Sequence, residues 1–471
     1  MERNPSSVLI VGAGVFGLST ALALTKRSGF EQTSITVVDD TRGSFPPPDG
    51  ASIDSSRIIR GDYADPVYTE LAALAQEEWR KQGDDDLGGQ GRYTESGMFL
   101  TANEVVGEAG VKGGMSYTKA SWKNALDICR GDKSMERKIS EVSGRKAIQE
   151  FLGVHGHAGD WGYINRMAGW ADAEEGMKWL HRKVVATGRV KFVDAQVKQL
   201  VTSEDRVTGA EMADGTVLKA DVTIVAAGAW TGTLIDLRGR AEATGQVLGY
   251  IDISDEEANI LKKQPVVLNL TTGLFIIPPR GNVLKAARHG WGYHNPQTVT
   301  TALPLSPSEE RKPIVVSCPM TGRNGSLDTL PAEADRDLRR AFRDLAPVKN
   351  LETRPWKHTR LCWYSDTVDG DWLVDWHPGW KGLFVATGDS GHGYKFLPVL
   401  GDKLVDCLVG EGGELAKKWR WKDIAAEDEL LGREVDGVFK GLQTKDGSRG
   451  GAKDMVLEEE LRKTKKMATR L

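Results

Sequence analysis

The sequence predicts a two-domain α/β protein in which an antiparallel-sheet domain is inserted into a domain built on a parallel sheet. Three observations carry this prediction. A strand, a glycine-rich turn and a helix follow one another near the N-terminus, strand signals resume around residue 190, and residues 236–350 are rich in Pro, Gly and β-branched residues. Strands that alternate with helices favour a parallel sheet, whereas short strands with alternating polarity favour an antiparallel one.

The first predicted strand leads into a G-x-G-x-x-G turn. Residues 8–11 form a short apolar run, Gly12, Gly14 and Gly17 supply the glycines, and a helix is expected over residues 18–25. The first glycine permits a tight turn, the second lets the backbone approach a pyrophosphate, and the third lets the helix pack closely on the strand. The helix N-terminus then offers unpaired N–H groups and a partial positive charge to the phosphates.

An acidic residue completes this motif. A second predicted strand, residues 34–38, ends at Asp39, about 22 residues after Gly17. A carboxylate there accepts hydrogen bonds from the ribose hydroxyls of an adenosine and favours a cofactor without a 2′-phosphate. Asp40 is an alternative for the same role. The sequence therefore predicts a Rossmann-like dinucleotide-binding unit, although the glycine turn alone also occurs in other α/β proteins.

The later strands predict that this domain is discontinuous. Residues 190–200 and 205–218 have the pattern of strands with an Asp-Gly turn, and residues 222–226 form a strand that leads into AAGAW. Small residues there either let the backbone pass close to a cofactor or make a simple strand-end turn. We assign residues 1–90, 155–235 and 351–410 to the dinucleotide-binding domain, 91–154 and 236–350 to a substrate domain, and 411–471 to a charged C-terminal extension with a loop and a surface helix.

The composition argues against several other classes of protein. The 471 residues are enough for two or three domains and a large core. With 62 Lys and Arg against 66 Asp and Glu, the formal net charge of −4 argues against a nucleic-acid binder. No apolar run reaches the ~18 residues of a membrane span. The four cysteines show neither metal-type pairs nor disulfide-dense spacing, which predicts an intracellular, reducing compartment.

A second informative segment, LCWYSDTVDGDWLVDWHPGWKGLFVATGDSGHGYKF, begins at Leu361. It places Cys362, a glycine-rich turn and Lys395 where a flavin ring would lie, so that the two segments together indicate a flavoenzyme. A nicotinamide-dependent dehydrogenase and a non-catalytic flavoprotein are the alternatives. The first would be favoured by a second nicotinamide-binding G-x-G-x-x-G, and the sequence has none.

The order and spacing of six segments identify a resemblance. These are GAGVFG, SSRIIRGDY, AAGAW, VLKAARHG, the strand that begins at Cys362, and SGHGYKF. The chain resembles the FAD-dependent amine oxidases that include monomeric sarcosine oxidase, pipecolate oxidase, N-methyltryptophan oxidase and the fungal saccharopine and fructosyl amino acid oxidases. The resemblance covers roughly residues 7–410, and the fungal branch is the more similar one. It implies a Rossmann-like FAD-binding domain with an inserted antiparallel-sheet substrate domain.

The resemblance implies that FAD is the cofactor and that Cys362 bonds covalently to its 8α-methyl carbon. By residue type alone, a buried structural cysteine is the simpler interpretation. The backbone around Ser390 and His392, with the helix that follows, would stabilise negative charge at the pyrimidine end of the flavin. The residues expected to bind FAD are Gly12, Gly14, Val15, Phe16, Gly17, Asp39, Asp40, Ser56, Arg57, Val197, Ala227, Gly228, Trp230, Cys362, Gly388, Ser390, Gly391, His392, Gly393 and Lys395.

Three residues are expected to be catalytic, namely Lys285, Arg57 and His289. Lys285 matches the lysine that lies over the flavin and activates oxygen, since a fixed cation stabilises superoxide as it forms. Without the resemblance it would be an exposed lysine on a strand. His289 is expected on the same strand face. Phe275 takes the place of a pocket aromatic that is tyrosine in sarcosine oxidase, and the missing hydroxyl leaves the substrate side chain open.

The substrate carboxylate is expected at Arg60 and Lys395. A guanidinium makes bidentate contacts with a carboxylate, and two cations that converge from distant segments are costly unless an anion lies between them. Solvated surface charge is the alternative for Arg57 and Arg60. The implied reaction oxidises a C–N bond of a secondary or N-alkyl amino acid to an imine and reduces O₂ to H₂O₂. In related enzymes of specialised metabolism the imine closes a ring.

The sequence leaves the substrate itself open. Sarcosine, pipecolate, saccharopine, glycated amino acids and a larger aromatic amine are all compatible, although the arginine pair makes a glycated substrate less favoured. We expect a monomer whose partners are a small amine and O₂, without nucleic acid or membrane. Thr469-Arg470-Leu471 is similar to the small-basic-leucine peroxisomal address, with threonine in place of the usual Ser or Ala. A peroxisomal or cytoplasmic location follows.

Overall fold

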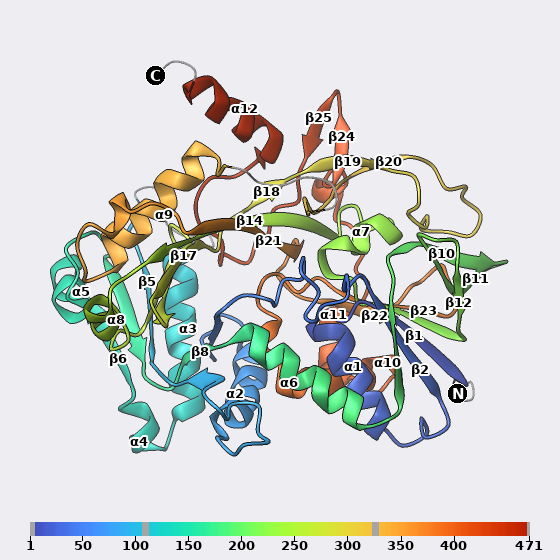
Figure 1. Cartoon of the computed structure of the whole chain (residues 1–471), viewed down its shortest axis with the longest axis horizontal. Helices are drawn as coiled ribbons and strands as arrows, with labels where there is room; N and C mark the ends of the chain where they lie inside the picture. The colour runs from blue at the N-terminus through green and yellow to red at the C-terminus, as the bar shows by residue number, and fades with distance from the viewer. Residues whose placement is uncertain (1–4, 106–112, 323–328, 469–471) are drawn as a thin grey trace.

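Two sheets that lie side by side form the framework of the molecule (Figure 1). The computed structural model describes residues 5–105, 113–322 and 329–468, so that Thr469-Arg470-Leu471 lies outside the described residues. One sheet is largely parallel and the other largely antiparallel. The predicted fold class, α/β with a Rossmann-like sheet and an antiparallel sheet domain, is confirmed.

The parallel sheet has β1 near its centre. Five of its strands are parallel, and β22 pairs with β23 in the antiparallel direction at one edge. Because helices or strands cover both faces, β1 is apolar along almost its whole length. The strands in spatial order are β22 (Leu373–Trp376), β23 (Leu383–Thr387), β13 (Val222–Val225), β1 (Ser7–Val11), β2 (Ser34–Asp39) and β9 (Val190–Asp194).

Helices cover one face of this sheet and a small sheet covers the other. A Cβ on Gly401 of the covering helix α10 would overlap the carbonyl oxygen of Ser19 of α1, so these two helices pack closely. The apolar side chains of the small sheet pack on Leu9 and Val11 of β1. The helices are α1 (Val15–Lys26), α2 (Pro66–Arg80), α6 (Ala173–Ala186) and α10 (Leu397–Leu408), and the small sheet contains β10 (Val197–Ser203), β11 (Arg206–Met212) and β12 (Val217–Lys219).

The large sheet is organised around the long strand β14. This strand pairs antiparallel with β17, β18 and β21, and its register places Tyr250 opposite Lys285 on one side and Gln246 opposite Cys362 on the other. The spatial order is β26 (Met455–Val456), β18 (Tyr293–His294), β14 (Ala241–Asp252), β17 (Val283–Arg288), β16 (Leu274–Arg280), β15 (Val266–Asn269), β5 (Met98–Ala102), β7 (Trp161–Asn165) and β6 (Ile139–Ser143), with β21 (His358–Thr367) joined to β14.

Helices also cover the large sheet. Apolar side chains of α3 (Gly114–Cys129) join one core with β5 and β7, and those of α9 (Ala332–Leu345) join another with β16 and β17. No helix among the described residues is long and apolar enough to span a bilayer. The remaining elements are β3 (Arg57–Ile59), β4 (Tyr93–Thr94), α4 (Lys133–Glu136), α5 (Arg145–Leu152), β8 (Gly169–Ala171), α7 (Thr231–Leu234), α8 (Asp255–Leu261), β19 (Pro296–Val299), β20 (Ile314–Ser317), α11 (Gly413–Trp419), β24 (Arg433–Val435) and β25 (Val438–Lys440).

The C-terminal extension ends in the helix α12 (Leu457–Ala468), which lies at the outer edge of the molecule (Figure 1). The loop before it differs from the surface loop that its composition predicts. In this C-terminal segment, residues 441–450, the side chains of Leu442, Thr444, Ser448 and Arg449 are buried. The hydroxyl of Thr444 donates to the carbonyl oxygen of Thr367 in β21 at 2.9 Å. The segment is therefore part of the interior.

Candidate active site

The turn between β1 and α1 has the backbone that the glycine spacing predicts. Gly12 has a φ of +108°, and a Cβ on it would overlap the carbonyl oxygen of Ala226 after β13. A Cβ on Gly17 would overlap the carbonyl oxygen of Gly12, so α1 packs directly on the turn. A Cβ on Gly14 would meet nothing within 4 Å, and this residue lines a cavity. The N-terminus of α1 is therefore placed to bind a phosphate group.

Asp39 lies beside this turn at the end of β2. One carboxylate oxygen accepts a hydrogen bond from the backbone N–H of Ala13 at 2.6 Å, and burial raises the pKa of Asp39 to about 6. Asp40 lines the same cavity. Because a carboxylate at the end of the second strand is within reach of ribose hydroxyls, this part of the cavity fits an adenosine.

The turn opens into a large cavity of about 710 Å³. Its walls come from both sheets, since Trp363 and Tyr364 of β21 line it together with the residues of the dinucleotide turn. The sequence-predicted residues that line it are Gly12, Gly14, Val15, Phe16, Asp39, Asp40, Arg57, Val197, Ala227, Gly228, Trp230, Gly391 and Gly393. The structure thus brings residues from the beginning, middle and end of the chain to one cavity.

A small cavity of about 70 Å³ adjoins the large one, and Arg57, Tyr364, Gly391 and Tyr394 line both. Its remaining wall is apolar at Leu248, Leu268 and Ile277. The sequence-predicted residues that line the small cavity are Ser56, Arg57, Arg60, Phe275, Lys285, His289, Cys362, Gly391, His392 and Lys395. All the predicted catalytic and substrate-binding residues therefore meet at this place.

Three predicted cofactor-binding residues line neither cavity. Gly17 lies behind the dinucleotide turn, where it allows the close packing of α1. Gly388 has a φ of +73°, and its Cβ would come within 2.8 Å of the Thr367 side chain. The hydroxyl of Ser390 lies 3.2 Å from the backbone nitrogen of Thr367. These residues shape the backbone behind the cavity wall.

Lys285 and Arg57 share one buried carboxylate, Asp54. The Lys285 ammonium donates to Asp54 Oδ2 at 2.9 Å and to the Ser56 carbonyl oxygen at 2.8 Å, and Arg57 forms an ion pair with the same carboxylate. Lys285 is only 4% exposed, so it is not a surface lysine. Burial lowers the pKa of Lys285 to about 8 against the opposing attraction of Asp54.

Arg60 and Lys395 are the cations of the site that have no ion pair among the described residues. Arg60 is 5% exposed, its Nη1 has no hydrogen-bond partner in the described chain, and its guanidinium lies 4.6 Å from the centre of the Tyr63 ring. The ammonium of Lys395 donates to the Tyr63 hydroxyl at 2.8 Å and to the His392 carbonyl oxygen at 2.9 Å. Burial and the Arg60 charge hold the pKa of Lys395 well below its usual value.

Cys362 lies on β21 and lines the small cavity. Its thiol is buried, and Nη2 of Arg57 lies 3.3 Å from Sγ. A ligand bound in this cavity is therefore within reach of the thiol.

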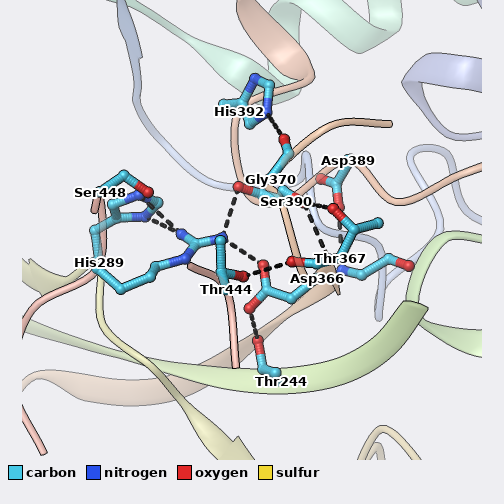
Figure 2. Close-up of polar contacts among 12 residues, drawn as sticks. Thr244, His289, Asp366, Thr367, Gly370, Asp389, Ser390, His392, Thr444 and Ser448 are labelled. Carbon is cyan, nitrogen blue, oxygen red and sulfur yellow. Dashed lines mark hydrogen bonds and ion pairs between the residues drawn. The ribbon is translucent and has the colours of Figure 1, made fainter. Parts of the chain in front are cut away.

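The C-terminal segment contributes a further cation, Arg449, which contacts His289 of the small cavity. His289, Asp366 and Ser390 lie around one place (Figure 2), and each of them contacts Arg449. Arg449 forms an ion pair with Asp366, donates to the Ser390 carbonyl oxygen at 2.9 Å, and lies 2.8 Å from Nδ1 of His289. Burial and the Arg449 charge lower the pKa of His289 well below its usual value, so the imidazole is neutral.

Sequence reasoning missed Asp54, Asp366 and Arg449. Asp54 directly precedes the SSRIIRGDY motif and Asp366 lies in the segment that begins at Leu361, but nothing in one sequence says which of these polar residues point inward. Arg449 stands in a charged, glycine-rich stretch that is typical of a surface loop. The identified motifs were a usable signal for the first two residues, and no local signal exists for Arg449.

The residues present fit FAD. The dinucleotide turn suits a pyrophosphate, Asp39 suits the adenosine ribose, and the large cavity extends from them to Tyr364 and Gly391, where the small cavity begins. An isoalloxazine ring at this junction would lie among Cys362, Arg57 and Lys285. The arrangement places two buried cations that have no ion pair among the described residues beside two cations that share the Asp54 carboxylate, all lining one cavity.

Comparisons with known proteins agree with this geometry. A family model described as FAD dependent oxidoreductase matches residues 7–407. The Amino acid oxidase imqH of Aspergillus flavus is 31% identical and is aligned over 88% of this chain and 98% of its own length. The L-saccharopine oxidase of Schizosaccharomyces pombe is 29% identical, over 92% and 97%. The structure of fructosamine oxidase (Amadoriase II) from Aspergillus fumigatus is similar with a TM-score of 0.73 and 27% identity, over 96% of this chain and 95% of that chain.

These matches confirm the resemblance that the sequence motifs identify. The family model extends from the first strand of the parallel sheet to the helix α10, and therefore includes the residues that line both cavities and every strand of both sheets except β26. The chain belongs to the family of FAD-dependent oxidoreductases.

Proposed function

We propose that this chain is an oxidase of a secondary or N-alkyl amino acid, with FAD as cofactor and O₂ as electron acceptor. The observation that carries the proposal is the pair of buried cations, Arg60 and Lys395, which line the small cavity without an ion-pair partner among the described residues. Relatives named amino acid oxidase, L-saccharopine oxidase and monomeric sarcosine oxidase support it.

The two cations would bind the carboxylate of the substrate. A buried, unpaired cation is costly, and an anion between two of them removes that cost. A carboxylate bound by the Arg60 guanidinium would also favour the charged form of Lys395, whose pKa is low while no anion is near. The apolar wall at Leu248, Leu268 and Phe275 would then hold the carbon part of the substrate.

The remaining residues of the site account for the oxidation. The bound cofactor would supply two-electron redox chemistry, so that the amine loses two electrons and two protons to become an imine, and O₂ takes up two electrons and two protons to become H₂O₂. Cys362 would hold the cofactor covalently beside the small cavity. Lys285 would place a positive charge where O₂ is reduced, and the parallel sheet would bind FAD while the large sheet forms the substrate wall.

The test combines a spectrum with a panel of substrates. Absorbance is measured for the purified protein before and after acid precipitation, and secondary amino acids are then added without oxygen. We expect the yellow colour to stay with the precipitate and at least one secondary amino acid to bleach the native protein. Product analysis of that reaction would distinguish hydrolysis of the imine from ring closure. A protein without flavin, or one that no amine bleaches, would contradict the proposal.

A further inference from the structure

Asp54 lies at the centre of a buried polar cluster beside the small cavity. Its side chain is 1% exposed. The carboxylate accepts from the Lys285 ammonium at 2.9 Å, is paired with Arg57, and accepts a hydrogen bond from the Tyr250 hydroxyl. Lys285 and Tyr250 stand opposite each other on β17 and β14, whereas Asp54 comes from the loop before β3. The cluster therefore joins that loop to the large sheet.

The contacts of the Lys285 ammonium fix its position. It donates to two acceptors, Asp54 Oδ2 and the Ser56 carbonyl oxygen, both on the same loop. These two hydrogen bonds, at 2.9 and 2.8 Å, hold the ammonium against the wall of the small cavity, which Lys285 lines. Replacement of the carboxylate by an uncharged group would leave a buried ammonium with one neutral acceptor.

The charges around Lys285 determine its protonation state. Burial favours the neutral amine, and the Arg57 guanidinium acts in the same direction, whereas the Asp54 carboxylate favours the ammonium. Although burial alone would raise it, the charges of Lys285, Arg57 and Arg360 hold the pKa of Asp54 well below its usual range. Asp54 is thus a permanent anion. Among the described residues, it is the acidic side chain that forms an ion pair with Lys285.

We propose that Asp54 is a positioning residue that keeps Lys285 protonated and in place, and thereby sets the rate at which the loaded enzyme reacts with O₂. This inference rests on the proposed function, in which Lys285 supplies the positive charge for oxygen reduction. A neutral amine at the same place would lack that charge, so the O₂ reaction would fall as pH rises through the pKa of Lys285. Asp54 extends the active range of the lysine toward higher pH.

The two half-reactions provide the test. Holoenzyme is reduced without oxygen and then mixed with O₂ across a range of pH, for wild type, Asp54→Asn, Lys285→Met and the double variant. We expect Asp54→Asn to react with O₂ about 10- to 100-fold more slowly at neutral pH and to recover part of the rate as pH is lowered. The double variant should match Lys285→Met, since Asp54 has no effect without the lysine.

Asp62→Asn is the matched control. Asp62 is a second fully buried carboxylate that lines neither cavity; it accepts from Tyr163 and Asn165 and has no contact with Lys285 among the described residues. Its replacement should leave the pH profile of the O₂ reaction unchanged. A profile that shifts equally in Asp62→Asn would overturn the proposal, because it would then reflect general disturbance of the site.

Two further measurements separate the outcomes. If Lys285→Met reacts with O₂ at the wild-type rate, the role of Lys285 in the proposed function is wrong; if only Asp54→Asn is unaffected, the present inference is wrong and that role stands. Should Asp54→Asn fail to fold, Arg57→Met serves instead, because removal of this cation should move the pH profile upward. The flavin absorbance of the oxidised holoenzyme responds to a nearby charge, so it can be followed as pH is changed. The pH at which it changes should be lower in Asp54→Asn and higher in Arg57→Met than in wild type.

Discussion

Individual side chains of this site gain their chemistry from neighbours far along the chain. Cys362 has Arg57 beside its thiol, and Lys285 has Asp54 beside its ammonium. By residue type, both would be ordinary parts of a strand. Their burial, 2% and 4% exposed, and these charged partners are the observations from which we propose a covalent anchor and a fixed cation.

The covalent anchor is testable with Cys362→Ser. We expect this variant to release its flavin into the supernatant on acid precipitation, because the hydroxyl of serine does not form the thioether. The flavin should still bind before precipitation through the dinucleotide turn and Asp39. Cys407→Ser, a change of a buried cysteine on α10, is the control and should keep its flavin in the precipitate. Flavin that stays with precipitated Cys362→Ser would refute the anchor.

The carboxylate site is testable with Arg60→Met. Loss of hydrogen bonds to a charged group costs about 1.5–3 kcal/mol, so we expect the KM for an amino acid to rise by about 10- to 150-fold. A substrate methyl ester should bind both proteins with similar, weak affinity. Steady-state kinetics with the acid and its ester measure this, and Arg130→Met, at an exposed arginine, is the control. Equal losses for acid and ester would mean that Arg60 acts in another way.

At the scale of the elements, the C-terminal segment is buried although its composition predicts a surface loop. Residues 441–450 are polar and glycine-rich, yet the backbone of Leu442 donates to Glu242 of β14, and Thr444 donates to Thr367 of β21. These hydrogen bonds satisfy the polar groups that a buried loop would otherwise leave unpaired. The helix α12 that follows is mostly exposed, as its charge pattern predicts.

Arg449→Met tests whether this segment stabilises the site. The change would leave the Asp366 carboxylate buried without its ion-pair partner, and breaking a buried pair in this way costs about 3–5 kcal/mol. We expect a clear drop in Tm and in the free energy of unfolding by denaturant. Arg462→Met on α12, where the side chain is 65% exposed, should change neither. Equal stability of Arg449→Met and wild type would show that the segment contributes little.

At the scale of the whole molecule, the large cavity lies between elements of both sheets. The parallel sheet supplies the dinucleotide turn, and the large sheet supplies Trp363 and Tyr364 as further lining residues. A ligand that fills this cavity contacts both parts. Binding to the folded state alone stabilises a protein in proportion to the logarithm of the ligand concentration.

Removal and return of the cofactor test whether binding in the large cavity stabilises the fold. Cys362→Ser stripped of flavin should unfold at a lower temperature than the same protein with FAD. The free energy of unfolding should rise by about 2.7 kcal/mol when free FAD is at 100 times its Kd. A titration of Tm with FAD measures this, and riboflavin, which lacks the pyrophosphate and adenosine, should raise Tm less. A Tm that FAD does not change would contradict the assignment of the cavity.

The sequence by itself determined the elements whose physics is local. Gly12, Gly17 and Asp39 were predictable because a tight turn, a close helix and a strand-end carboxylate each follow from residues near in the chain. The family motifs also predicted that Lys285 and Lys395 share a site, and both line the small cavity. The domain boundaries stay a prediction.

Only the tertiary structure decided which charges meet. Asp54 pairs with Lys285, and Arg449 with Asp366, through contacts between distant segments that no local pattern encodes. Both pairs have the same physical reason. A charge that is buried without an opposite charge beside it is costly, and the packing of the fold, rather than the distance along the sequence, decides which opposite charge lies beside it. The sequence thus determined the family, the cofactor type and the glycine turn after β1, while the fold decided which buried cations have no ion pair within the described part of the chain.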